Sequence, residues 1–579
     1  MKSTMSHRLT HVASAVVLAL LASCGLPASG DVHVVRRILT DQQSDDSDIR
    51  RIAPGPAPGA TPEQIVRGFF AAESNDDDQH AVARQFLERP SGWDAGGGAD
   101  VYDENPLRVS IAASSDPKVI RAVVGFARKG RIGDDGSFTA EVATVTETLD
   151  LRQVAGQWRL VGVPKGLQLS GRDVARSFVA ANIWFLTRDS ARPRLVPDPR
   201  LLQTNATGLP SSLARALLAG PSSRLLGVTR TAVPAGSQLQ GSAVLVDGEI
   251  SVDFSTAVAT VRGEQRDFLL AQLAQTMRQV TGATRLRVTS GGRGLSGADP
   301  EAGSIASLTS ILEPTGDEAP TSPPTAYGLS GGELVALGSA AADALPAGWT
   351  RISDLLRIVG DPDSQRIVAL QRRDSLTDVL LGGVATRPVE VLTPAAYDAV
   401  AITPDGKALV HRAGAHPAVL LADDRGSTEV TLPNSIHASD IIAMCVARDG
   451  LHVALALREG QGRTARRVLQ ITTLVRAEKP TLSELGPPVP NLSQVSDVAW
   501  SGATHVIAIG ASDSGAVRPF DVLIDGSELS PLSNAGLPSQ PVSIADWPGS
   551  RMLVVDEGKV WAFGSGWAVL GRATDVTYA

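Results

Sequence analysis

The chain has 579 residues, of which 43% are hydrophobic and 20% are charged. One hydrophobic core does not support this length, so we expect about three or four domains. The net charge of −8 argues against a nucleic-acid-binding protein, and the two distant cysteines exclude both a disulfide framework and a four-cysteine metal site.

The composition favours a β-rich fold. Gly (56) and Pro (36) are frequent, whereas aromatic residues make up only 4% of the chain. Many turn-forming residues and few aromatics are typical of short strands joined by Pro-rich connectors rather than of a helical bundle.

Residues 1–23 are predicted to be a signal peptide. Lys2 and Arg8 form a basic start, and Val12–Leu21 is an apolar run of ten residues. A membrane-spanning helix needs roughly 20 apolar residues, so the run is too short for a transmembrane anchor.

Leu21, Ala22, Ser23 and Cys24 place small residues directly before a cysteine. This tetrapeptide resembles the lipobox of bacterial lipoproteins. The resemblance implies cleavage between Ser23 and Cys24, a diacylglycerol on the Cys24 sulfur and an acyl chain such as palmitate on its amino group. Such double lipidation holds a protein stably at a bilayer. The alternative is an ordinary secretory signal in which Cys24 stands by coincidence.

Residues 24–60 are polar and end in a Pro-rich stretch, Ile52–Pro62. Pro-rich segments favour extended polyproline II, so we predict a semi-rigid tether behind the lipidated cysteine. A disordered tail with no spacer role is the alternative.

Residues 61–168 are predicted to form a small α+β domain. Thr61–Glu63 is a helix start, and apolar residues at helical spacing follow over 65–70. A second short helix is expected at about 79–87, followed by alternating strands with turns at Asp135 and Gly156. This order is similar to the NTF2-like fold. We find no catalytic pairing of carboxylates or histidines in it, and interpret it as a structural domain.

A second α+β domain is predicted over 171–291. Asp247-Gly248 separates two apolar triplets and signals a hairpin. An amphipathic helix is expected over Gln265–Val280, and a strand is expected over Leu286–Ser290. The order resembles the GerMN domain of spore-germination and envelope proteins, through the pieces Leu195-Val196-Pro197, Arg200, Leu217 to Pro221, Val233-Pro234 and Val252-Asp253-Phe254.

Residues 292–325 are predicted to be a linker. Gly292, Gly294 and Gly297 match the dinucleotide-binding pattern, but that pattern needs an immediate helix to hold the pyrophosphate. Asp299-Pro300 and a Pro-rich stretch follow instead, so we expect no cofactor.

Residues 326–579 repeat a module of an apolar strand, a tight turn and a second apolar strand. The turns recur near residues 362, 405, 449, 502 and 549. A period of about 40–50 residues is typical of β-propeller blades, and the length predicts about six. Closure of the ring requires its two ends to meet in one blade, for which Gly328–Gly338 and the C-terminal GRATDVTYA are candidates.

Three features of this region could indicate catalysis or metal binding. Gly328 to Gly332 matches the GxSxG nucleophile pattern, but a short strand follows it, so a hairpin turn is expected. His411 and His416 are spaced poorly for metal binding, and no metal is expected. Cys445 lies in an apolar strand and is interpreted as a buried small hydrophobe.

The lipobox, the two α+β domains and the propeller, in this order, resemble the LpqB family of actinobacterial lipoproteins. The resemblance covers nearly the whole chain after Cys24. It implies a non-enzymatic protein, lipid-anchored at the outer face of the cell membrane, that binds the extracytoplasmic part of the sensor kinase MtrB. Through the MtrA–MtrB two-component system it would influence envelope homeostasis and division.

The alternative hypothesis is a cell-wall glycan-binding or hydrolytic propeller. Paired carboxylates are the catalytic groups of most glycosidases. Acids at corresponding strand starts would have to converge at one end of the ring, and the candidates are Asp398, Asp440, Asp497 and Asp546. Capping of the strand starts is the simpler interpretation.

Overall fold

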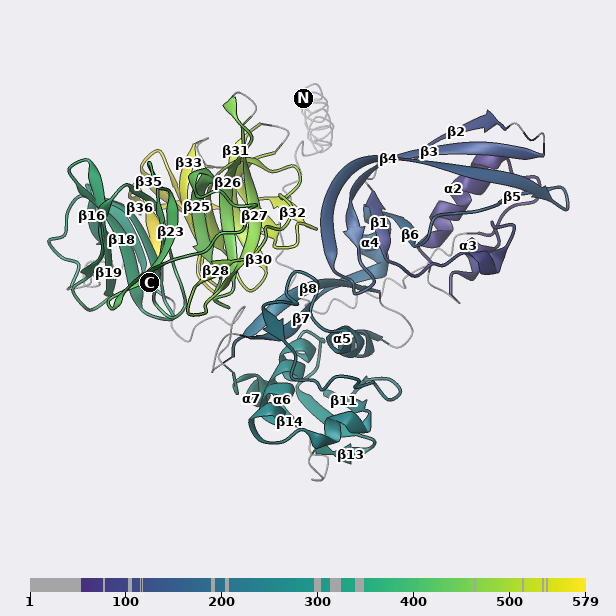
Figure 1. Cartoon of the computed structure of the whole chain (residues 1–579), viewed down its shortest axis with the longest axis horizontal. Helices are drawn as coiled ribbons and strands as arrows, with labels where there is room; N and C mark the ends of the chain where they lie inside the picture. The colour runs from purple at the N-terminus through teal and green to yellow at the C-terminus, as the bar shows by residue number, and fades with distance from the viewer. Residues whose placement is uncertain are drawn as a thin grey trace, which may run out of the picture. The chain divides into compact units, whose positions relative to one another are not determined.

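A computed structural model describes the chain over residues 54–75, 79–102, 107–114, 116, 118–188, 193–203, 208–295, 303–312, 324–338, 348–462, 465–512, 515–533, 536–537 and 540–579. Three β-rich domains follow one another along this part of the chain (Figure 1). They confirm the predicted fold class of two α+β domains and a β-propeller. None of the described helices combines the length and apolarity needed to cross a membrane.

The first domain is a six-stranded sheet bent over one helix. The strand order is β5-β4-β3-β1-β6, and β2 pairs with β3. Figure 1 shows the two longest strands, β3 and β4, curving around α2 as a half-barrel. The elements are α2 (Pro62–Glu73), α3 (Ala81–Arg84), η1 (Pro90–Gly92), β1 (Ala99–Tyr102), β2 (Arg108–Ala113), β3 (Val119–Ile132), β4 (Phe138–Val154), β5 (Gln157–Leu160), β6 (Leu167–Ser170) and α4 (Gly171–Ser177).

Helix α2 begins where the sequence predicts. The Thr61 hydroxyl accepts the Gln64 N–H, and the Gln64 side chain accepts the Thr61 N–H, which together form a capping box. The predicted apolar stripe, including Phe69 and Phe70, is buried in the core.

The second predicted helix is shorter than expected. Helix α3 covers only Ala81–Arg84 because the following backbone bonds to β5 instead of continuing the helix. The Leu160 N–H donates to the Phe86 carbonyl, and the Glu88 N–H donates to the Leu160 carbonyl.

The second domain contains one sheet in the order β10-β11-β12-β13, with β14 on β12, and a second in the order β8-β7-β9. Helices α5 and α6 belong to its core. The elements are β7 (Phe178–Thr187), β8 (Leu195–Gln203), α5 (Gly208–Ala219), β9 (Thr229–Arg230), β10 (Val244–Val246), β11 (Glu249–Phe254), η2 (Thr256–Thr260), α6 (Gly263–Met277), β12 (Arg285–Ser290), β13 (Arg293–Gly294), β14 (Gly303–Ser304) and α7 (Ile305–Thr309).

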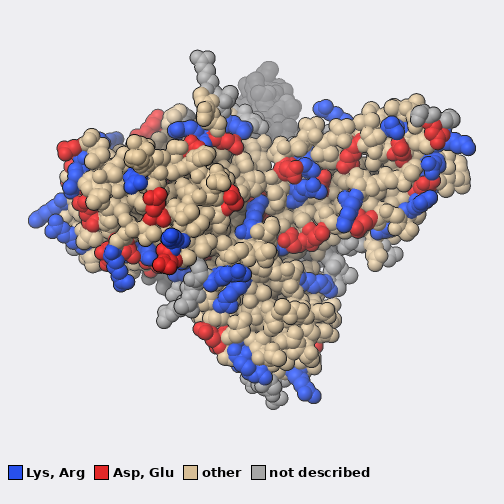
Figure 2. Space-filling view, in the orientation of Figure 1, with Lys and Arg blue, Asp and Glu red and all other residues tan. Residues whose placement is uncertain are grey.

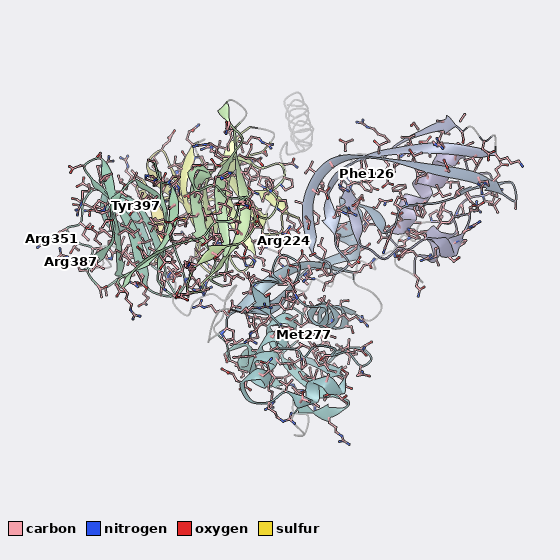
Figure 3. All side chains as sticks on the ribbon, viewed as in Figure 1. Phe126, Arg224, Met277, Arg351, Arg387 and Tyr397 are labelled. Atoms are coloured by element: carbon pink, nitrogen blue, oxygen red, sulfur yellow. The ribbon has the colours of Figure 1, made fainter. Side chains whose placement is uncertain are left out.

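The predicted hairpin at Asp247-Gly248 is confirmed. Both residues have positive φ, 50° and 76°, as a type I′ turn between β10 and β11 requires. The predicted helix is α6, and Met277, labelled in Figure 3, is buried within this domain.

Part of the predicted linker belongs to the second domain, which corrects our expectation for residues 303–312. Strand β14 pairs with β12, and α7 follows directly. Ile305 and Leu312 are buried in the domain core, and this apolar burial holds the segment in place. The glycines of the dinucleotide-like pattern that the structure describes belong to the β12–β13 hairpin, and Gly297 lies outside the described residues.

The third domain is a six-bladed propeller over the described residues. Five blades have four strands: β17 (Leu355–Asp361), β18 (Arg366–Arg373), β19 (Leu376–Gly383) and β20 (Val389–Ala395); β21 (Tyr397–Ile402), β22 (Ala408–Arg412), β23 (Ala418–Asp423) and β24 (Gly426–Glu429); β25 (Ile441–Val446), β26 (His452–Glu459), β27 (Arg466–Val475) and β28 (Thr481–Leu482); β29 (Ser493–Trp500), β30 (His505–Ala511), β31 (Val517–Leu523) and β32 (Leu529–Pro531); β33 (Pro541–Ala545), β34 (Leu553–Asp556), β35 (Lys559–Phe563) and β36 (Trp567–Arg572).

The remaining blade closes the ring. The C-terminal strand β37 (Val576–Tyr578) pairs with β15 (Ala326–Ser330), which pairs in turn with β16 (Glu333–Ala336). These are the two candidate segments for closure. Gly360 on β17 permits the closing strand to approach, since a Cβ there would lie 2.4 Å from the Tyr578 carbonyl oxygen. The GxSxG match is a hairpin turn, as predicted: Gly331 and Gly332 have positive φ and connect β15 to β16.

Candidate functional site

The lipidation site predicted from the sequence, Leu21 to Cys24, lies outside the described residues. The structure therefore places none of these four residues. Other candidate sites come from the described domains, and the propeller contains the two cavities considered first.

The first cavity is the central channel of the propeller, with a volume of about 80 Å³. Its walls are the first strands of the blades, namely β17, β21, β25, β29 and β33, together with β37. These strands neighbour one another around the ring. The ends of the strands add two tryptophans, Trp500 and Trp547, to the lining.

An ion pair between the partly buried Arg357 and the buried Asp497 lies beside this channel. Arg357 of β17 donates to the Oδ1 atom of Asp497, which lies on β29 and is 1% exposed. The second oxygen of Asp497 accepts the main-chain N–H of Ile544 at 3.0 Å. One carboxylate thus connects three blades, because the three residues lie on three different first strands.

Asp575 is the second buried carboxylate beside the channel. It precedes the closing strand β37 and accepts the Ile358 N–H at 2.8 Å and the Ser543 hydroxyl. Burial raises the pKa of Asp575, although the Arg357 guanidinium works in the opposite direction. Both oxygens of Asp497 and both oxygens of Asp575 therefore have hydrogen-bond donors, which satisfies these buried groups.

The charges of the channel act on one another. The Asp497 carboxylate beside Arg357 raises the pKa of that guanidinium, so the side chain stays positively charged. Cys445 on β25 also lines the channel, and burial raises the pKa of its thiol to about 12. Cys445 is a free cysteine that lines the channel, and the residue as a whole is partly exposed, whereas the sequence predicts a buried small hydrophobe.

The four acids singled out in the sequence do not form one site. Asp546 lines the channel, whereas Asp497 lies directly before the lining residue Val498 and pairs with Arg357. Asp398 lies 2.5 Å from the Nδ1 atom of His411, in another part of the ring, and Asp440 ends a short 3-10 turn, η5 (Ala438–Asp440). The sequence reasoning missed Asp575. The pattern Asp575-Val-Thr resembles Asp497-Val-Ala, and this similarity was the available signal.

Metal binding finds no support in the described part of the chain. No group of three or more His, Cys, Asp or Glu side chains there is arranged to hold a metal ion. His411 is buried against Asp398, whereas the His416 carbonyl accepts a hydrogen bond from Arg412.

The second cavity is a wide groove of about 580 Å³ beside strands β23 and β24. Its floor contains buried apolar residues such as Val430 and Ile436, and its rim contains exposed polar residues such as Thr431, His437 and Ser439. We call this surface the blade groove. It is lined by Pro417, Ala418, Val419, Glu429, Val430, Thr431, Leu432, Ile436, His437, Ala438 and Ser439.

Charged side chains on the surface are mixed in sign. Figure 2 shows Lys and Arg interspersed with Asp and Glu over the visible face. This distribution agrees with the net charge of −8 and differs from the basic patch of a nucleic-acid-binding protein.

Three family models match the chain in the order of its domains. The N-terminal domain of lipoprotein LpqB matches residues 55–175, the sporulation and spore germination domain matches 182–296, and the LpqB β-propeller domain matches 332–576. The matched segments coincide with the three domains described above.

Known proteins are similar over almost the whole chain. The lipoprotein LpqB of Thermobifida fusca is 26% identical and the alignment covers 94% of each chain; that of Cutibacterium acnes is 26% identical with 87% of each chain covered. Among solved structures, TolB from Acinetobacter baumannii is 14% identical, with a TM-score of 0.33, 53% of this chain covered and 85% of that chain.

The fold and these matches define a multi-domain lipoprotein that combines a GerMN domain with a β-propeller. The family follows from the first and third models and from the full-length relatives. The chain belongs to the LpqB family of lipoproteins.

Proposed function

We propose that this protein is anchored by lipid at Cys24 to the outer face of the cell membrane, where it binds and modulates a sensor histidine kinase of the MtrB type. The observation that carries the proposal is the match of all three domains, in order, to the LpqB family. The kinase partner is the one that the family resemblance implies.

The polar cluster of the propeller channel favours a structural role over catalysis, which agrees with a non-enzymatic function. Its two buried carboxylates are both held by donors of the protein, Asp497 by Arg357 and Ile544, and Asp575 by Ser543 and Ile358. A general acid or base must instead be free to exchange a proton with a substrate. The cavity of about 80 Å³ is also far below the roughly 300–1,000 Å³ of ordinary ligand pockets.

The blade groove is the surface that we propose for contact with the kinase. It is broad and open, with an apolar floor and a polar rim, as partner-binding surfaces commonly have. Its rim residue Ser439 is exposed, so a substitution there changes the surface without disturbing the core.

The binding test is a quantitative pull-down of the chain from residue 31 onward with the extracytoplasmic domain of the kinase. We expect saturable binding, weakened at least tenfold by Ser439→Arg in the blade groove. Ser427→Arg is the matched control, since Ser427 is exposed on β24 of the same blade but does not line the groove. Absence of binding at high concentration would contradict the kinase as partner.

The anchor is tested separately with Cys24→Ala. We expect this variant to lose lipid labelling and to leave the membrane fraction. The Cys445→Ala variant is the control, because it removes the other cysteine and should remain lipidated. A Cys24→Ala protein that stays acylated and membrane-bound would refute the lipobox.

A further inference from the structure

The half-barrel of the first domain carries polar side chains on its concave face. The strand register establishes this, since paired residues lie side by side on one face of a sheet. Gln168 of β6 pairs with Asp100 of β1. Two residues further along β1, Tyr102 pairs with Arg128 of β3. Val124, on the same face of β3 as Arg128, pairs with Glu147 of β4. The residues of this face therefore lie on the side of the sheet that packs against α2.

Glu73 adds a carboxyl group from the opposite side. It is the last residue of α2 and is 1% exposed. Its Oε2 atom accepts the main-chain N–H of Gln168 at 2.6 Å, which places the carboxyl group beside β6. The Glu73 carboxyl group thus meets the polar face at Gln168.

The buried polar atoms of this region without a hydrogen-bond partner in the described part of the chain include the Nε atom of Arg128, which is a donor, and Oδ1 of Asp100, which lies 3.0 Å from Nε of Arg131 in an ion pair. Three further ones are oxygen atoms, namely Oε1 of Glu73, Oε2 of Glu147 and Oε1 of Gln168. All three are acceptors, and Gln168 is only 3% exposed. A buried acceptor without a donor costs roughly 1–3 kcal/mol, so a donor from outside the described side chains would stabilise these three oxygens.

The charges near these oxygens are also unbalanced. Arg128 and Arg131 lie within ion-pair distance of Asp100, at 3.4 and 3.0 Å. Among the described residues, no ion pair joins Glu73 or Glu147 to a cation. Burial raises the pKa of Glu73 well above its usual value, and the negative charge of Glu147 adds to the shift. These two glutamates would be stabilised as carboxylates by a bound cation.

A positively charged group rich in N–H donors would satisfy these oxygens and balance the two carboxyl groups. A primary ammonium presents three N–H groups and no acceptor, which matches three unpaired acceptors and two uncompensated carboxyl groups. Tyr102 and Phe126, whose ring centroids lie 5.4 Å apart, supply an aromatic wall on the same face, and aromatic rings attract cations. Phe126 is labelled in Figure 3, on the curved part of the half-barrel.

We propose that the interior of the half-barrel binds the primary ammonium group of a small amine, held by Glu73, Glu147 and Gln168. The two sources of such a group are a free amine and a lysine side chain presented by a peptide. The proposal concerns the first domain alone and does not depend on the kinase as partner.

Isothermal titration calorimetry of the full chain in detergent tests the proposal. The probes are n-butylammonium and a blocked pentapeptide with one central lysine, and either probe tests the same site chemistry. Tetramethylammonium, which has charge but no N–H group, and n-butanol, which has no charge, are the ligand controls. We expect saturable binding of n-butylammonium or of the peptide and none of either control. Binding of the peptide alone would assign the lysine source.

The matched variants are Glu73→Gln and Asp150→Asn. Glu73→Gln keeps an acceptor for the Gln168 N–H but removes the charge, and should weaken binding at least tenfold. Asp150 lies on the same strand as Glu147 but on its opposite face, so Asp150→Asn should change the affinity less than twofold. Glu147→Gln provides a second affinity measurement if the Glu73 variant is poorly folded.

Three outcomes would overturn the proposal. The first is the absence of binding by both ammonium probes, which would mean that water alone fills the interior or that Glu73 and Glu147 share a proton. The second is equal binding of tetramethylammonium or n-butanol. The third is unchanged affinity in both glutamate variants, which would place any bound amine elsewhere on the protein.

Discussion

The propeller channel and the half-barrel interior both bury acidic side chains, but they differ in how these acids are satisfied. In the channel, the two oxygens of Asp497 accept from Arg357 and Ile544, and the two oxygens of Asp575 accept from Ser543 and Ile358. In the half-barrel, one oxygen of Glu73 and one of Glu147 lack a donor among the described residues.

This difference separates a structural polar cluster from a candidate binding site. A buried charge whose donors belong to the protein holds the fold together, and breaking it leaves another charge unpaired. A buried acceptor without a donor indicates a group that the chain itself does not supply. The number of donors around each buried acid therefore distinguishes a structural cluster from a candidate binding site better than the number of buried acids does.

The largest expected effect comes from opening the propeller ring. Removal of residues 576–579 deletes β37 and the buried side chains of Val576 and Tyr578. Burial of two such side chains contributes roughly 3–6 kcal/mol, so the blades beside the closure should open. Hydrogen exchange should accelerate in β15 and β17, whereas β3 and β4 of the half-barrel should be unchanged. Unaltered exchange in β15 would contradict the observed closure.

Arg357→Ala tests the structural role of the channel ion pair. The variant leaves the Asp497 carboxylate buried without its cation, which should cost about 3 kcal/mol. The exchange-derived opening free energy of β17 and β29 measures this loss. The control is Arg466→Ala, which breaks an exposed ion pair with Glu459 and should cost less than about 1 kcal/mol. Equal effects of the two substitutions would remove the distinction between a structural ion pair and a surface pair.

Glu73→Gln should change how the stability of the half-barrel depends on pH. The pKa of Glu73 is raised above 4.5 in the folded state, so the folded protein binds this proton more tightly than the unfolded chain. The free energy of unfolding therefore falls as pH rises from 4.5 through the folded pKa. In amine-free buffer we expect the free energy of unfolding of the variant to depend less on pH across this window than that of the wild type. At pH 8 the variant should be more stable than the wild type by on the order of 1–3 kcal/mol.

Urea denaturation at pH 5 and pH 8 checks this prediction, with Asp150→Asn as the control. The free energies of unfolding of the wild type and of Glu73→Gln should differ more at pH 8 than at pH 5. An equal pH dependence in the wild type and in the Glu73 variant would show that this carboxyl group titrates normally, and the contrast with the channel would weaken.

Alkylation of Cys445 tests the channel wall without any change in stability. A thiol with a pKa of about 12 is almost entirely protonated at pH 8, and the thiolate is the reactive form. In the chain from residue 31, where Cys445 is the sole cysteine, alkylation by iodoacetamide should be roughly a thousandfold slower than for glutathione. Urea should restore the normal rate. Rapid alkylation of the folded protein would place the thiol in solvent rather than in the channel wall.

Local and repeated patterns made much of the fold predictable. The Thr61 capping box, the Asp247-Gly248 hairpin and the strand–turn–strand repeats depend on neighbouring residues, and each appears as expected. Ring closure was predictable in outline, because a propeller must join its ends. The segment 303–312 was not, since its place depends on pairing with β12 and on burial of Ile305 in a distant core.

The polar clusters were harder to predict because their members are far apart in sequence. Arg357 and Asp497 are separated by 140 residues, and Glu73 and Gln168 by 95. No spacing in a single sequence connects such residues. The structure connects them through the convergence of first strands in the ring and through the register of the half-barrel sheet.

A high-resolution crystal structure of the chain from residue 31, soaked with n-butylammonium, tests the contrast between the two clusters most directly. We predict density for one nitrogen within hydrogen-bond distance of Glu73, Glu147 and Gln168, and an unchanged Arg357–Asp497 pair with no amine beside it. Only water at the three oxygens, or a short contact between the two glutamates, would contradict the proposed ammonium site.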